Sequence, residues 1–139
     1  SGADLVIGGH GNDTLAGGGG VDVFKWELSD RGTAAAPAAD RITDFDNNAG
    51  GDKLDLRDLL LGEHNTAGSL QDYLHFSVDA TGSTKIEVSS SGGFAGGTYA
   101  PTAVDQTITL SGVNLVGSFT SDAQVINDLI ARSKIVVDA

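Results

Sequence analysis

The sequence contains no cysteine and no methionine. Without cysteine, neither disulfide bonds nor thiolate metal sites can stabilise the fold. No apolar run approaches the roughly 18 residues of a membrane-spanning helix, and the N-terminus lacks the basic and then apolar layout of a cleaved signal peptide. Because the chain begins at Ser1 and has no methionine, we expect it to be a piece of a longer protein.

Positive charge is scarce. The 139 residues include 8 lysines and arginines against 19 aspartates and glutamates, which gives a net charge of −11. This balance argues against nucleic acid as a partner, because phosphates require lysine and arginine, and against anionic membrane surfaces. The carboxylates either solvate the surface or bind hard cations. A secreted chain of this size without disulfides needs another stabilising element, and a bound metal is one candidate.

Sequence patterns of catalysis are also missing. The three histidines, His10, His64 and His75, belong to no zinc-protease motif. There is no G-x-S-x-G elbow, and the glycine-rich stretch lacks the Lys-Ser/Thr end of a phosphate-binding loop. We therefore predict that this chain is not an enzyme, and that any active site of a parent protein lies upstream of Ser1.

Glycine, in contrast, is abundant and periodic. Residues 8–16 read GGHGNDTLA and residues 17–25 read GGGGVDVFK, and both fit the pattern G-G-x-G-x-D-x-U-x, in which U is a large apolar residue. A truncated earlier copy places Asp4 in the same phase as Asp13 and Asp22. A flexible glycine-rich linker would not keep aspartate and an apolar residue in fixed phase across three copies. The repeat therefore predicts an ordered structure.

The chemistry of this nonapeptide predicts a calcium-binding coil, and the pattern is a known signature of calcium-binding β-solenoids. Each copy is expected to form a turn followed by a short strand. Glycine permits the positive φ angles and the close approach of backbone that let carbonyl groups face an ion. Aspartate supplies the anionic oxygen that Ca²⁺ prefers. An ion between stacked turns would offset the conformational entropy that the glycines lose on folding.

The spacing of the aspartates predicts which turns stack. Two nonapeptides form one coil of about 18 residues, so residues one coil apart lie on the same edge. Asp40 follows Asp22 at that spacing and begins the triplet Asp-Arg-Ile. We therefore expect one edge to stack Asp4, Asp22 and Asp40.

The other edge is expected to stack Asp13 with a carboxylate near position 31, for which Asp30 is the closest candidate. The loop DFDNNAGGD would follow, with Asp46 and Asp52. Each of the later carboxylates has an alternative role as a solvated turn residue. At least two calcium ions are expected, because each edge has a candidate pair of stacked turns. The candidate ligands are Asp4, Gly8, Gly9, His10, Gly11, Asp13, Gly17, Gly18, Gly19, Gly20, Asp22, Asp30, Asp40, Asp46 and Asp52.

These motifs resemble those of the RTX proteins, which are bacterial proteins exported through type I secretion systems. The nonapeptides occupy the first 25 residues. Residues 40–60, DRITDFDNNAGGDKLDLRDLL, resemble the D-x-I-x-D-F…G-D-x-[IL]-D-L segment that closes the calcium roll in serralysin proteases and many RTX adhesins. Later segments are similar to the C-terminal target domain of large RTX adhesins: 70–77, 84–93, 106–115 and 124–139. Three nonapeptides are few, so we expect the roll to depend on the downstream part for stability.

The resemblance implies a non-catalytic module of a large secreted adhesin. It implies an uncleaved C-terminal secretion signal read by an ABC transporter, folding on extracellular calcium, and a secreted or cell-surface location. We expect a monomer, with a calcium roll in residues 1–60 and a β-rich part carrying the signal in residues 61–139, joined in one continuous domain. Two alternatives remain open. One is a calcium-dependent adhesive or carbohydrate-binding module that uses the loop 89–103 with Tyr99, and the other is the C-terminal roll of a secreted protease or lipase.

The expected fold is all-β, a parallel β-roll or β-solenoid that continues into a β-sandwich-like part with a short C-terminal helix. Alternating apolar residues predict strands within 69–80, 83–91 and 106–113. The helix is predicted after Ser121, because Ser121 to Gln124 fit the S-x-x-Q capping box. The order of the strands in the second half is not determined by the sequence.

Overall fold

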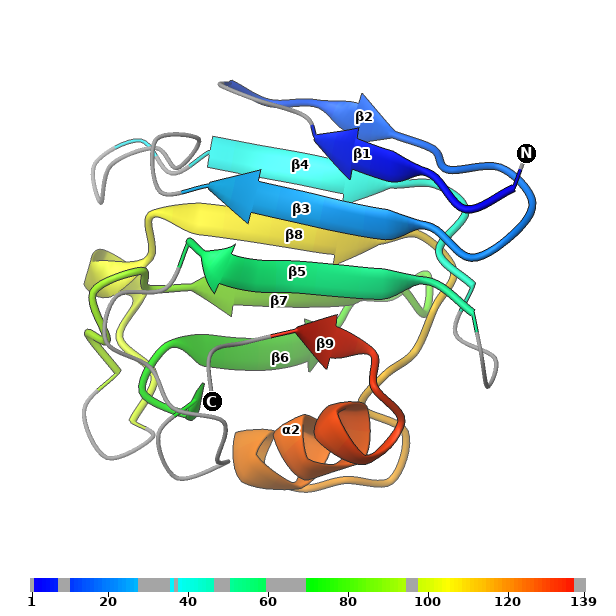
Figure 1. Cartoon of the computed structure of the whole chain (residues 1–139). Coiled ribbons are helices and arrows are strands. Elements are labelled where there is room, and N and C mark those ends of the chain that lie inside the picture. The colour runs from blue at the N-terminus through cyan, green and yellow to red at the C-terminus, as the bar shows by residue number, and fades with distance from the viewer. Residues whose placement is uncertain are drawn as a thin grey trace.

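The structure is a computed structural model, and the residues that it describes form two facing β-sheets and one α-helix (Figure 1). The described residues are 2–7, 11–27, 36, 38–46, 51–59, 70–94 and 98–136. The predicted all-β fold, a parallel roll that continues into a sandwich-like part, is confirmed.

The first sheet is entirely parallel. Its strand order is β1 (Leu5–Ile7), β3 (Val23–Glu27), β5 (Lys53–Asp58) and β9 (Ile135–Val136). The second sheet has the order β2 (Thr14–Leu15), β4 (Ala38–Ile42), β8 (Gln106–Leu110), β7 (Thr84–Val88) and β6 (Leu74–Val78). Strands β2, β4 and β8 are parallel, and the hairpin β6–β7 adds to them in antiparallel pairing.

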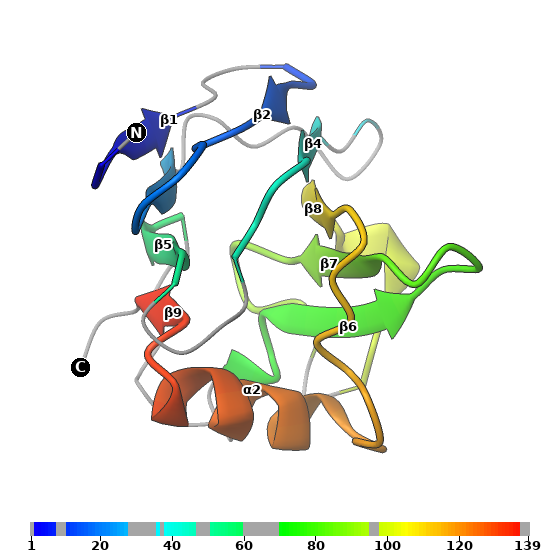
Figure 2. The ribbon, with the colours of Figure 1, turned by 90° about the vertical axis from the view of Figure 1, so that its right-hand side faces the viewer.

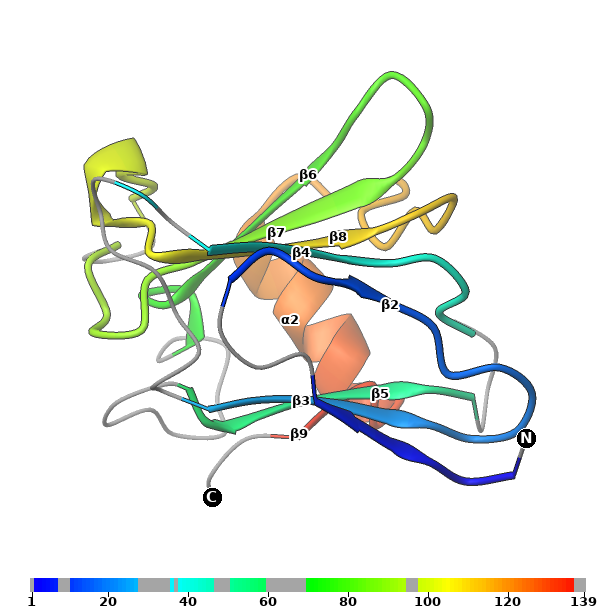
Figure 3. The ribbon, with the colours of Figure 1, turned by 90° about the horizontal axis from the view of Figure 1, so that it is seen from above.

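The C-terminal part extends both sheets of the roll. Strand β8 pairs beside β4, and β9 pairs beside β5, in both cases in parallel. Seen from above, the two sheets form separate layers (Figure 3). The helix α2 (Asp122–Ala131) lies across the end of the two layers, next to β6 and β9 and opposite β1 and β2 (Figure 2). The short 3₁₀ helix η3 (Pro101–Ala103) precedes β8.

The core lies between the two sheets and follows the alternation of each strand. In β8, Gln106, Ile108 and Leu110 are buried while the residues between them are partly exposed. Phe24 and Leu54 of the first sheet are fully buried in the same apolar cluster. The inward row therefore contains one polar position, and β4 contributes another at Asp40, which is 2% exposed.

The helix begins as the capping pattern predicts, with one difference. Ser121 Oγ accepts a hydrogen bond from the Gln124 backbone N–H at 3.3 Å. The Gln124 side chain reaches back to the N–H of Thr120 at 2.7 Å, one residue before the cap. Val125, Ile126 and Leu129 form the buried face of the helix. Within the described ranges, no helix is both long and apolar enough to span a membrane.

Candidate metal-binding turns

The first stack of aspartates lies where the chain enters β1, β3 and β5. These strands pair in register, so Asp4, Asp22 and Asp52 precede them at equivalent positions. The carboxylates of Asp22 and Asp52 each accept the backbone N–H of the aspartate one coil earlier. The Asp4 N–H donates to Asp22 Oδ1 at 3.0 Å, and the Asp22 N–H donates to Asp52 Oδ1 at 2.9 Å. The turns are therefore joined by their own aspartates.

The second stack consists of Asp13 and Asp40 in the other sheet. The Asp13 N–H donates to Asp40 Oδ1 at 2.8 Å, and the two residues are 27 apart in sequence. The prediction that Asp40 stacks on Asp22 was wrong, because the segment between β3 and β4 is longer than the repeat spacing allows: Thr14 pairs with Arg41, whereas Leu5 pairs with Val23. The same extra length moves Asp52, which was expected beside Asp13, to the edge of Asp22.

The turn that ends at Asp22 encloses a buried carboxylate oxygen. Asp22 is fully buried, and its Oδ2 has no hydrogen-bond partner among the described residues. Gly17 lies so close that a Cβ there would be 2.3 Å from this oxygen. Gly20 has a φ of +104°, and a Cβ there would be 2.2 Å from the carbonyl oxygen of Gly2. Glycine is thus required at both positions by space, and at Gly20 also by backbone conformation.

A hard cation fits this arrangement. Asp13 Oδ2 is, like Asp22 Oδ2, buried without a hydrogen-bond partner in the described part of the chain. We call these two atoms the unpaired oxygens. A buried anionic oxygen is costly unless a donor or a cation compensates it. Because residues 2–136, apart from the gaps given above, contain no group of three or more candidate side-chain ligands, an ion here would need backbone carbonyl oxygens as well, which suits Ca²⁺.

Asp40 and Asp52 differ from the residues that carry the unpaired oxygens, because protein donors occupy both carboxylate oxygens of each. Asp52 Oδ2 accepts the Asp46 N–H at 2.8 Å. Asp40 Oδ2 accepts the indole N–H of Trp26 at 2.7 Å and the Gln106 amide at 3.0 Å. Burial raises the pKa of the Asp40 carboxyl, and the hydrogen bonds from Trp26, Asp13 and Gln106 oppose this effect. Asp40 and Asp52 thus act as buried hydrogen-bond acceptors in this structure.

Sequence reasoning missed Asp44. Its carboxylate accepts the N–H groups of Gly17 at 3.0 Å and Gly18 at 2.8 Å, and so holds the start of the turn above it. The signal was present, because Asp44 lies two residues after the end of β4, one coil below the glycine turn. Asp44 was overlooked because it lies outside the glycine–aspartate phase.

The other predicted ligands have separate outcomes. Gly8, Gly9, His10 and Asp30 lie outside the described residues. Gly11 and Gly18 have positive φ angles, as a tight turn requires, and the carbonyl oxygen of Gly19 accepts the Gly2 N–H at 3.0 Å. The role of these residues as calcium ligands remains a prediction.

Lys134, which lies between α2 and β9, is in the interior of the protein. Its side chain is buried, with 1% of the residue exposed, and Nζ donates to the carbonyl oxygen of Asp46 at 3.2 Å. Burial lowers the pKa of the Lys134 ammonium, and the carboxylates of Asp46 and Asp52 act in the opposite direction. The Lys134 side chain thus lies beneath the last acidic turn.

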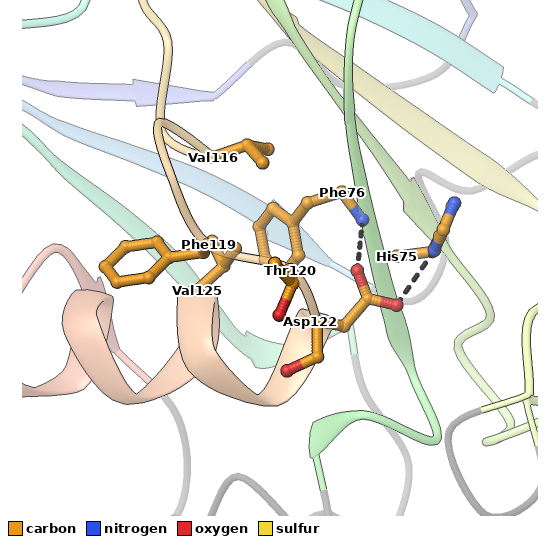
Figure 4. Close-up of a pocket in the computed structure, with 8 residues that line it drawn as sticks. His75, Phe76, Val116, Phe119, Thr120, Asp122 and Val125 are labelled. Atoms are coloured by element: carbon orange, nitrogen blue, oxygen red, sulfur yellow. Dashed lines mark hydrogen bonds and ion pairs between the residues drawn. The ribbon is translucent and has the colours of Figure 1, made fainter.

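A separate cavity of about 170 Å³ lies where α2 meets β6 (Figure 4). The Asp122 carboxylate accepts the Phe76 backbone N–H at 2.9 Å and contacts His75 Nδ1 at 2.8 Å. Phe119 and Val125 supply apolar wall. His75 also stacks on the ring of Tyr99, at a centroid distance of 4.1 Å. These contacts fasten the start of the helix to the second sheet.

Comparison with known proteins agrees with this geometry. Residues 3–91 match the family described as Peptidase M10 serralysin C terminal. The structure resembles the solution structure of the AlgE6R2 subunit of the Azotobacter vinelandii mannuronan C5-epimerase, with a TM-score of 0.57 and 25% identity over 97% of this chain and 71% of that one. The AlgE6R3 subunit of the same enzyme has the same fold, with a TM-score of 0.54 and 24% identity over 97% and 66% of the two chains. A search among curated protein sequences gave no match.

Proposed function

Because the chain belongs to the serralysin C-terminal family of M10 peptidases, we propose that it is a non-catalytic calcium-binding module that directs type I secretion and folds on extracellular calcium. The family and the neighbouring structures support an RTX-type β-roll from secreted proteins. The observation that carries the calcium assignment is the unpaired oxygen of Asp22, enclosed in stacked glycine turns.

The acidic turns explain why folding would wait for export. Cytosolic free calcium is far below the roughly 10⁻⁴–10⁻³ M at which extracellular calcium modules bind. Asp22 and Asp52 are both fully buried on adjacent coils, so their mutual repulsion opposes folding when no cation is bound. Calcium, when bound, supplies positive charge and is coordinated by the oxygen atoms of the turns. The upper coils would therefore remain open inside the cell and close outside.

For the parent protein we propose a large RTX adhesin. The family match ends at residue 91, and the segments of the second half resemble the C-terminal target domain of such adhesins. The helix α2 and strand β9 fall in this part. We propose that an ABC transporter reads this stretch before folding, and that the same stretch completes the two sheets afterwards.

Export of a fused passenger tests this function. Deleting residues 120–139 is expected to abolish export, because the stretch that the transporter reads is lost. Leu54→Ala is the matched control: Leu54 is fully buried, and the change costs about 2–5 kcal/mol of folding stability without touching the signal. Export of the control should continue. If the deletion variant is secreted as well as the intact fusion, the secretion role is wrong.

A further inference from the structure

A basic residue, Lys134, lies beneath Asp52, the last aspartate of the first stack. The connection from α2 to β9 lies on the same side of the molecule as the turns that lead into β3 and β5 (Figure 1). Leu54 of β5 pairs with Ile135 of β9, and the Leu54 N–H donates to the carbonyl oxygen of Lys134 at 2.8 Å. In this register Lys134 corresponds to Lys53, one residue after the position of Asp52, so Lys134 lies in the coil beneath the last acidic turn. The pairing of β5 with β9 thus brings a basic residue beneath the last turn of the stack.

The backbone aims the Lys134 side chain inward. Ser133 has a φ of 56° and ends the helix in a left-handed conformation, and the Lys134 N–H donates to the carbonyl oxygen of Leu129 at 2.8 Å. The ammonium then reaches the carbonyl oxygen of Asp46, within the turn that Asp52 closes through the Asp46 N–H. A backbone carbonyl oxygen and nearby carboxylates are the surroundings that a calcium ion would seek.

The carboxylates of Asp22 and Asp52, on adjacent coils of the stack, therefore differ in what compensates their charge. At the upper coil, Asp22 Oδ2 has no donor within the described ranges. At the lower coil, both oxygens of Asp52 have backbone donors, and a buried ammonium lies below. A buried charge is retained at low cost only when it is paired and hydrogen-bonded.

We propose that Lys134 supplies the cation of the last acidic turn, so that Asp46 and Asp52 come together without a calcium ion. This inference rests on the proposed calcium-dependent folding, since it assigns calcium to the upper coils and the ammonium to the lowest one. The module would then contain one part that folds without metal and one that requires metal.

Amide hydrogen exchange in EDTA tests the inference with Lys134→Met, which keeps an unbranched stem and removes the charge. Lys85→Met is the control, because Lys85 is an exposed residue of β7 and the change removes the same charge. We expect the Asp52 and Leu54 amides to lose at least tenfold protection in Lys134→Met and to remain protected in the control. Equal protection in the two variants would overturn the proposal.

A second variant covers the case in which Lys134→Met does not fold. The double change Lys134→Met with Asp52→Asn removes both buried charges, so the loss of protection should be smaller than the sum of the two single effects. An additive result, or a double variant that also fails to fold, would show that Lys134 acts only through packing. Calcium added to the unaltered protein tests the proposed function separately: its upper strands β1 and β2 should gain protection whatever the result for Lys134.

Discussion

Gly20→Ala is expected to destabilise the calcium-bound protein by about 2–4 kcal/mol. Two effects combine. The φ of +104° is a left-handed conformation that residues with a Cβ adopt at a cost, and the new Cβ would lie 2.2 Å from the carbonyl oxygen of Gly2. The clash separates the turn 17–22 from the one above it. Urea unfolding measures the loss, followed through Trp26, which is the single tryptophan and is fully buried.

Gly19→Ala is the matched control for this prediction. Gly19 is the adjacent residue, its φ is outside the left-handed region, and a Cβ there would have open space around it. Its expected effect is within about 0.5 kcal/mol in either direction, as for an ordinary surface change. Similar losses in the two variants would mean that close stacking of the turns does not hold the roll together.

The effect of Asp22→Asn on the stability of the protein is expected to change sign between calcium and EDTA. With calcium bound, the variant loses an anionic ligand, and its calcium affinity should fall roughly tenfold or more, which is about 1.4 kcal/mol for each factor of ten. In EDTA the variant should be more stable than the unaltered protein, because the change neutralises a buried oxygen that has no donor in the described structure. Calorimetric calcium titration and urea unfolding in EDTA measure the two effects.

Asp40→Asn is the comparison for Asp22→Asn, because Asp40 is a hydrogen-bond acceptor whereas Asp22 is the proposed calcium ligand. Asp40 Oδ2 accepts hydrogen bonds from Trp26 and Gln106, and an amide nitrogen there would face two donors. The cost should be about 1–3 kcal/mol both in saturating calcium and in EDTA, without a change of sign. If Asp22→Asn also destabilises the protein in EDTA, its unpaired oxygen is not the source of the metal requirement.

The sequence predicted the roll where local chemistry determines it. The glycine–aspartate phase located β1, β2 and β3, and the capping pattern at Ser121 located α2, because turns and caps depend on neighbouring residues. The alternation of apolar residues located the hairpin β6–β7 in the same way. These features require no knowledge of distant contacts.

The failures involve long-range pairing. The edge occupied by Asp40 depends on the length of the segment between β3 and β4, which breaks the repeat without changing its motif. The parallel pairing of β8 with β4, and of β9 with β5, joins residues far apart in sequence. Lys134 was overlooked for the same reason, since only the position of β9 brings it beneath Asp46. Charge and residue type were visible in the sequence, but their neighbours were not.

The two stacks of aspartates indicate how such a short roll is stabilised. The upper coils keep the unpaired oxygens of Asp13 and Asp22, and the lower coils use Trp26, Gln106 and Lys134 in place of further repeats. The C-terminal strands thus provide the neighbouring layers that three nonapeptides cannot provide for themselves.

Anomalous diffraction from crystals grown with calcium tests the central claim most directly, because it locates the ions relative to named oxygens. The account predicts a calcium peak in contact with Asp22 Oδ2 and with carbonyl oxygens of the stacked glycine turns. A map without a peak at this carboxylate, in crystals that contain saturating calcium, would contradict it.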